Sequence, residues 1–430
     1  MRRAVQTLRR NKLLLHNIIF FTGALVVGAL NYLYYPVLGR LVSPTVFGEV
    51  QTLVSLFLQL NVLFGVLGLL TVSLVKKHES QANSSRVIIE LEKLSLIISI
   101  LMLGVVWFAS GPIQEFFRFS SGMPFVILAL TVAITVPFTF RSSYLRGHSF
   151  FGLNSWALII GAASKLLFSV GFIIAGLGTT GAILGIALAQ LLAFLYAAWQ
   201  AKRHGFDESL RGVIFKPLDL GLIKPELAYA GLVLVCTLLL TCMYSADIVI
   251  VKRLFDAHTA GLYAGVAAVA RIPFFLTASI PQVLMSSVHT GQPAIQNHKV
   301  LRQSFILIMG LGGASALFFW LLPDWTITLL MGQAYSSYAH LLPQLGLSVF
   351  IISVINLFVT YYLALRRWRI GLVVVGGAVV TTVLMILWHG SLEEIVNSLL
   401  AGSIATMGLF MVLIGLEALW RTKKLKGGDQ

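Results

Sequence analysis

The sequence is poor in charged residues. Only 11% of its 430 residues are Asp, Glu, Lys or Arg, and 58% are hydrophobic, whereas soluble domains are about a quarter charged. The mean hydropathy is +0.90. This composition excludes an ordinary soluble protein. Because a transmembrane helix needs about 20 apolar residues, a dozen spans would leave only short connections, and we expect no separate soluble catalytic domain.

Patterns typical of metal sites and redox sites are also scarce. The two cysteines, Cys236 and Cys242, lie in one apolar segment, with neither metal-ligand spacing nor disulfide geometry on a continuous helix. None of the nine histidines forms an i, i+4 ligand pair, and no Asp-x-Asp occurs. We therefore expect no metal, no cofactor and no enzymatic activity.

Apolar runs of membrane length recur along the whole chain. They predict an all-α polytopic membrane protein with 12 transmembrane helices. The predicted spans are 13–38, 46–75, 92–111, 123–145, 152–176, 180–199, 225–250, 260–288, 303–322, 341–365, 370–388 and 395–419.

These spans divide into two sets of six. We expect an N-terminal lobe at 1–199, a cytoplasmic linker at 200–224, and a C-terminal lobe at 225–430 that ends in a basic tail. The basic N-terminus precedes an apolar run that is too long for a signal peptide. The apolar run is therefore interpreted as the first membrane helix.

Positive charges support this map, because cytoplasmic loops retain Lys and Arg. Most of the 31 lysines and arginines fall at the termini or in connections on the predicted inner side, so both termini are predicted to be cytoplasmic. This placement also argues that the net charge of +15 reflects membrane topology and not a nucleic-acid partner. The exceptions are Arg40, Arg118, Lys252 and Arg253 on the outer side, and Lys165 and Arg271 within spans.

The two halves carry a similar motif near their first outer turns. RLVSPTVFGEV begins at Arg40 and RLFDAHTAGLY begins at Arg253, with Gly48 and Gly261 at corresponding positions. The motifs join spans of the same order in each half, which predicts a parallel repeat about an axis along the membrane normal. Two such lobes can rock about a central site, which is alternating access.

These segments also resemble a known family. GRLVSPTVFGEV, with Pro44, Phe47 and Gly48, and SADIVIVKRLFDAHTAGLYAGVAAVARIP, with Asp247 and Arg271, resemble polysaccharide-biosynthesis (O-antigen-type) flippases of the multidrug/oligosaccharidyl-lipid/polysaccharide (MOP) exporter superfamily. The resemblance implies movement of a polyprenyl-diphosphate-linked oligosaccharide from the inner to the outer leaflet. It also implies an inner plasma membrane location and, as a candidate partner, a glycan polymerase.

Two basic residues lie near the predicted midplane, Lys165 in the fifth span and Arg271 in the eighth. A charge there is costly, so it normally faces protein or water. Together the two could form a cationic chamber for a diphosphate. The alternative is that each pairs with a carboxylate or with carbonyl groups and only holds its bundle together. Pro273, which follows Arg271 closely, predicts a bend that could direct the guanidinium inward.

Other charged residues lie near span ends. Arg40, Glu49 and Asp247 form a candidate gate at the outer mouth, although an ordinary interfacial charge set explains them as well. Arg141 and Arg146, at the inner end of the fourth span, could receive a lipid diphosphate from the cytoplasmic leaflet. A solvated positive-inside flank is the alternative reading of that pair.

Three other functions remain open from the sequence. A multidrug exporter of the same superfamily would often use carboxylates in its first helix, but the span 13–38 contains no Asp or Glu. A lipid II flippase usually carries two helices more than the 12 predicted for this chain. A membrane glycan polymerase or glycosyltransferase would be expected to have a large outer loop or clustered carboxylates, and the longest predicted outer connection is only 323–340.

Overall fold

The computed structural model describes residues 22–23, 25–77, 81–206, 224–288 and 290–426. Among these residues the regular secondary structure is entirely helical. By the contacts of its helices the chain divides into two compact units. The first comprises Met1–Leu234 with Phe255–Gly265, and the second comprises Val235–Leu254 with Val266–Gln430.

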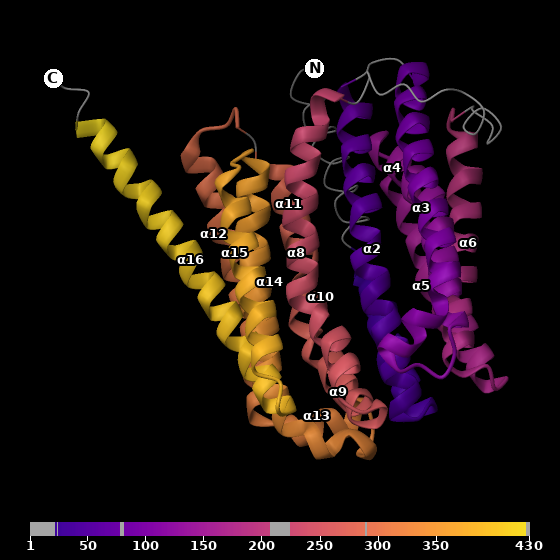
Figure 1. The fold of residues 1–430 in the computed structure, drawn as a ribbon. Coiled ribbons are helices and arrows are strands. Elements are labelled where there is room, and N and C mark those ends of the chain that lie inside the picture. Colours follow the sequence, from indigo (N-terminus) through magenta and orange to yellow (C-terminus); the bar gives the residue numbers. More distant parts are fainter. Residues whose placement is uncertain (1–21, 24, 78–80, 207–223, 289, 427–430) are drawn as a thin grey trace. The chain divides into compact units, whose positions relative to one another are not determined.

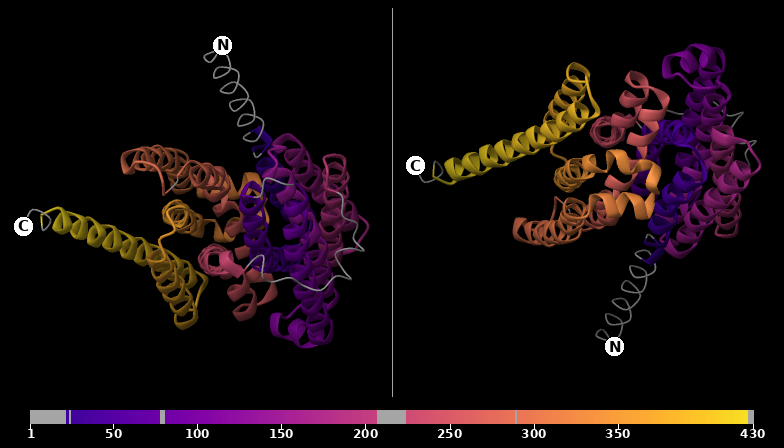
Figure 2. Two further views of the ribbon diagram at one scale, coloured as in Figure 1. Left: turned by 90° about the horizontal axis from the view of Figure 1, so that it is seen from above. Right: turned by 90° about the horizontal axis from the view of Figure 1, so that it is seen from below.

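The first unit is a bundle of long helices around α4 (Figures 1 and 2). Helix α4 packs on α2, α3 and α6, and α5 packs along α6. Apolar side chains of α4 such as Leu128, Val132 and Val136 are buried, because this helix packs against several neighbouring helices. The helices are 25–41, α2 Pro44–Lys77, α3 Gln81–Phe117, α4 Met123–Gly147, α5 Phe151–Ile174 and α6 Gly178–Arg203.

The second unit is arranged around α14, which packs on α10, α11, α12 and α16 (Figure 1). Helix α15 packs mainly on α16. The elements are α8 Lys224–Leu254, α9 Ala257–Ala270, α10 Ile272–Thr277, α11 Ser279–Ser287, α12 Ala294–Leu321, α13 Pro323–Leu330, the 3-10 helix η2 Gln333–Leu341, α14 Leu342–Ala364, α15 Arg369–Leu387 and α16 Leu392–Lys426. Helices α8 and α9 contribute residues to both units.

The described residues contain 11 helical segments long and apolar enough to cross a membrane. They correspond to the second through twelfth predicted spans, with most boundaries within a few residues. The first predicted span, 13–38, begins outside the described residues, as most of the predicted linker 200–224 lies outside them. Twelve helices with cytoplasmic termini therefore stay a prediction, while the multi-pass helical architecture is established.

The eighth predicted span is not one continuous helix. It consists of α9, α10 and α11, with a first break at Arg271 and a second at Ala278. Pro273 lies just after the first break and cannot donate a backbone hydrogen bond to the preceding turn. The structure thus places Arg271 at a helix junction, and the long connection at 323–340 folds into α13 and η2.

Small residues let α15 and α16 approach closely. Gly377 on α15 faces Thr406, and Gly402 on α16 faces Thr381. A Cβ atom built on Gly377 would lie 2.8 Å from the Thr406 Cβ, and one built on Gly402 would lie 2.7 Å from the Thr381 Cα. Close backbone packing through Gly and Thr is typical of helix pairs in membranes.

We expect Gly402→Val to destabilise this helix pair, because the new side chain must displace the backbone at Thr381. Overpacking of this kind costs about 1–3 kcal/mol, and it should lower the melting temperature of the purified protein in detergent by several degrees. Gly408→Val is the matched control, since a Cβ at Gly408 meets no neighbour within 4 Å. Equal melting temperatures for the two variants would contradict the packing argument.

Candidate functional site

Lys165 lines a pocket inside the first unit. Its ammonium donates a hydrogen bond of 2.5 Å to the Asn31 Oδ1 and lies 4.4 Å from the centre of the Tyr34 ring. The pocket has a volume of about 120 Å³ and is also lined by the amide of Gln190. Helix 25–41, α4, α5 and α6 supply its walls.

No carboxylate balances this ammonium among the described residues. None of the residues that line the pocket is acidic, and the neighbours of Lys165 are a neutral amide and a neutral aromatic ring. Asn31 is itself oriented by its Nδ2 group, which donates to the Val27 carbonyl at 3.0 Å. The pocket therefore offers a fixed positive charge together with neutral hydrogen-bonding groups, which suits an anion.

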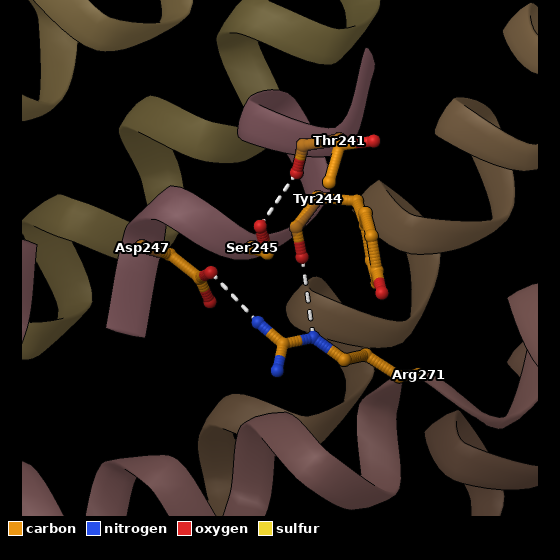
Figure 3. Close-up of polar contacts among 5 residues, drawn as sticks. All are labelled: Thr241, Tyr244, Ser245, Asp247 and Arg271. Carbon is orange, nitrogen blue, oxygen red and sulfur yellow. Dashed lines mark hydrogen bonds and ion pairs between the residues drawn. The ribbon is translucent and has the colours of Figure 1, made fainter. Parts of the chain in front are cut away.

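Arg271 has a different environment in the second unit. Its Nη2 donates to the Asp247 Oδ1 at 2.9 Å, and its Nε donates to the Tyr244 carbonyl at 3.2 Å (Figure 3). Both charged side chains are buried, with exposed fractions of 7% and 3%. The guanidinium also lies 5.4 Å from the centre of the Tyr244 ring. Its charge is thus balanced locally by one carboxylate.

The Arg271–Asp247 ion pair joins two residues for which the sequence predicts different depths in the membrane. The sequence places Asp247 near the outer end of its span and Arg271 near the midplane, and it leaves open whether Arg271 pairs with a carboxylate. The helix break at Arg271 and the length of the arginine side chain join them. Asp247, predicted as part of an outer gate, is the carboxylate partner of Arg271.

The other two candidate gate residues, Glu49 and Arg40, have environments that differ from that of Asp247. Glu49 on α2 is buried, with an exposed fraction of 4%. Its carboxylate accepts hydrogen bonds from the Thr179 hydroxyl at 2.6 Å and from the Ser120 N–H at 3.3 Å. Glu49 thereby ties α2 to the start of α6. Arg40 is exposed near the end of helix 25–41.

Arg141 is buried and paired within the first unit. Its guanidinium donates to the Glu92 Oε2 at 2.5 Å and lies 4.2 Å from the centre of the Phe206 ring. Phe206 follows the end of α6 and is buried. Arg141 thus joins α3, α4 and the end of α6, and Glu92 is a partner that no sequence pattern indicated.

Arg146 lies one turn further along α4. Its Nη2 donates to the Ser143 hydroxyl at 3.1 Å, and its Nε is buried without a hydrogen-bond partner among the described residues. Glu90, Glu92 and Lys93 on α3 belong to no motif that the sequence singles out, yet the structure buries all three.

Asp256 immediately precedes α9, in the turn that follows α8. Its Oδ1 accepts hydrogen bonds of 3.0 Å from the N–H groups of His258 and Thr259, as an N-cap residue does. The Thr259 hydroxyl, followed by these backbone groups, lowers the pKa of the Asp256 carboxyl below its ordinary value. This carboxylate therefore fixes the start of α9 and is ionised at neutral pH.

Solved structures with the same fold are membrane transporters. The chain aligns with an inward-facing multidrug resistance MATE family transporter of the MOP superfamily at 14% identity, with a TM-score of 0.69 over 94% of this chain and 99% of the other. The lipid II flippase MurJ gives the same identity and TM-score over 94% and 87%. A MOP superfamily transporter from Pyrococcus furiosus, described as having a binding pocket of reversed polarity, gives 14% identity and 0.58 over 94% and 95%.

Sequence comparison identifies the family. No curated protein matches the chain significantly in sequence. The family model for polysaccharide biosynthesis proteins, however, matches residues 14–285, which is more than half of the chain and includes Lys165 and Arg271. The chain therefore belongs to the polysaccharide biosynthesis protein family, and its fold is that of the MOP superfamily of membrane transporters and flippases.

Proposed function

We propose that this protein is a flippase that moves a polyprenyl-diphosphate-linked oligosaccharide from the inner to the outer leaflet for cell-surface polysaccharide assembly. The observation that carries the proposal is the Lys165 pocket. A lysine without an acidic partner among the described residues, flanked by Asn31 and Gln190, is suited to a phosphate group. A cationic drug would be repelled by the same charge.

The proposed mechanism is alternating access by two six-helix lobes, 1–199 and 225–430, joined by the linker 200–224. In this scheme the phosphate groups bind at Lys165 while the polyprenyl tail stays in the lipid. Arg271 contributes less to anion binding than Lys165, because Asp247 balances its charge. Twelve spans, cytoplasmic termini and the inner plasma membrane are part of this proposal.

Arg141 and Arg146 are the residues predicted to receive the substrate from the cytoplasmic leaflet. Arg141 is buried and paired with Glu92, and the half-buried Arg146 is held by Ser143, so they are better suited to shaping the inner end of α4 than to sampling the cytoplasmic leaflet freely. A glycan polymerase that consumes the translocated lipid is the proposed partner.

Deletion of the gene should cause lipid-linked glycans to accumulate. Mass spectrometry of lipid extracts from cells with and without the gene measures this accumulation, and the mass of the accumulated species identifies the glycan. We expect one polyprenyl-diphosphate glycan to rise several-fold in the deletion strain and to return to its original level when the wild-type gene is restored.

The same strains distinguish the alternatives. Unchanged lipid-linked glycans combined with greater sensitivity to cationic dyes would replace the flippase proposal with a drug exporter. Accumulation of lipid II alone would make the protein a lipid II flippase. A strain that carries Lys165→Met is the internal control, because it should accumulate the same glycan as the deletion strain.

A further inference from the structure

The second unit contains a pocket of its own, of about 180 Å³, between α8, α10 and α14. It is separate from the Lys165 pocket, which is formed by helices of the first unit. Several water molecules would fit in this volume, and so would one sugar ring. Its polar lining residues are Thr237, Thr241, Tyr244, Asn356 and Thr360, and the ring of Phe274 also lines it.

This pocket is neutral. None of its ten described lining residues is charged. The nearby Arg271 binds the backbone carbonyl of Tyr244 and the carboxylate of Asp247 (Figure 3), so its charge is balanced outside the pocket lining. A phosphate would find no cation in this lining, and a cationic drug would find no carboxylate.

The pocket nevertheless offers hydrogen-bonding groups that the protein leaves unused. The side-chain amide of Asn356 and the hydroxyls of Thr237, Thr360 and Tyr244 make no hydrogen bond to any described residue. Asn356 and Thr360 lie one turn apart on α14, and Thr237 and Tyr244 lie two turns apart on α8, so each pair occupies one helix face. Such groups can bind a ligand that both donates and accepts hydrogen bonds.

An aromatic pair completes the wall. The rings of Tyr244 and Phe274 are stacked, with centres 4.6 Å apart and planes 9° from parallel. The hydrogen bond from Arg271 to the Tyr244 carbonyl holds this turn of α8 in place. An aromatic wall next to unused amide and hydroxyl groups suits a ligand with one apolar face and a rim of hydroxyls.

We infer that this pocket is a monosaccharide subsite, which binds one sugar of the lipid-linked glycan through Asn356, Thr237 and Thr360 and against the Tyr244 and Phe274 rings. The inference rests on the proposed function and adds a division of roles to it. Lys165 in the first unit binds phosphate, and the neutral pocket in the second unit distinguishes a glycosylated lipid from a bare one.

The test compares four lipids on the purified protein in lipid nanodiscs. The probes are a polyprenyl diphosphate without sugar and the same lipid with one hexose, one N-acetylhexosamine or one deoxyhexose, each measured by native mass spectrometry. For the wild type we expect at least one glycosylated lipid to bind about tenfold more tightly than the bare lipid. Each lost hydrogen bond is expected to reduce that preference about twofold.

The variants Thr237→Val, Asn356→Leu and Thr360→Val should each lower the preference, and the triple variant should bind glycosylated and bare lipids within about twofold of each other. Their binding of the bare lipid should stay at the wild-type level, which also shows that they are folded. Thr382→Val, on α15 and outside both pockets, is the matched control. Lys165→Met should weaken all four lipids equally and leave the preference intact.

Three outcomes would overturn the inference. The triple variant could keep the full preference for a glycosylated lipid. The wild type could bind all four lipids equally, in which case the phosphate proposal stands and the sugar subsite does not. A planar cationic dye could bind in the pocket with its affinity reduced by the same three substitutions. If the wild type bound no polyprenyl diphosphate at all, the proposed function itself would fail as well.

Discussion

Replacing Lys165 with methionine is expected to reduce glycan translocation at least tenfold while the protein still folds. Methionine keeps the length of the side chain but removes the one charge among the described residues that line the pocket. Hydrogen bonds to charged groups contribute about 1.5–3 kcal/mol, and a loss of 1.4 kcal/mol is about tenfold in affinity. Transport of a lipid-linked glycan into proteoliposomes, or rescue of the deletion strain, measures the effect.

The stability of this variant should behave in the opposite way to its activity. Lys165 has no carboxylate partner among the described residues, and removing an unpaired charge from an apolar surrounding relieves a cost of desolvation. The melting temperature of Lys165→Met in detergent should therefore equal or exceed that of the wild type. This combination of lower activity with unchanged stability separates a binding group from one that holds the bundle together.

Two controls accompany this experiment. Lys165→Arg keeps the charge and should retain part of the transport activity, although its planar guanidinium does not fit the Asn31 contact in the same way. Lys202→Met removes an exposed lysine at the end of α6 and should have no effect. Full transport by Lys165→Met would remove the basis of the proposed anion site.

The second large effect is expected at the Arg271–Asp247 ion pair, and it concerns stability. Breaking a buried ion pair by removing one partner typically costs about 3–5 kcal/mol, because the remaining charge is left buried and uncompensated. Arg271→Met and Asp247→Leu should each lower the melting temperature strongly. The double variant, in which neither charge remains, should recover most of the loss.

The double variant also decides what Arg271 does. If the ion pair acts mainly to hold the helix junction, the folded double variant should retain substantial transport after reconstitution. A folded double variant without transport would instead show that Arg271 acts on the substrate, as the sequence analysis expected. Glu393→Gln is the matched control, because it removes an ion pair with His340 whose side chains are about half exposed and should cost less than about 1 kcal/mol.

Lys165 and Arg271 show why similar sequence signals had different outcomes. Both are basic residues near the middle of an apolar span, and hydropathy treats them alike. What separates them is one side chain from another helix, the Asp247 carboxylate, which reaches Arg271 while no described acid reaches Lys165. The identity of that partner depends on helix rotation and on the break at Arg271, which a pattern of apolar residues does not encode.

The pairing of Arg141 is a second feature that the sequence pattern does not determine. Arg141 also fits a solvated inner flank, because positive charges there satisfy the positive-inside rule. The structure buries Arg141 and provides Glu92 as its partner, and it likewise pairs the buried Lys93 with Glu90. The same sequence pattern fits a solvated flank and a paired one, since the pairing depends on how α3 packs against α4.

The sequence by itself determined the membrane class, the succession of helices and most of their boundaries, together with the family resemblance. The physical reason is that the bilayer acts as a solvent that requires long apolar helices with satisfied backbone groups, and this requirement is local in sequence. Only the tertiary structure decided which charges are paired, where the eighth span breaks, and that Thr237, Asn356 and Thr360 share a pocket with two stacked aromatic rings. Those features depend on distances between side chains far apart in the chain, which are set when the helices pack.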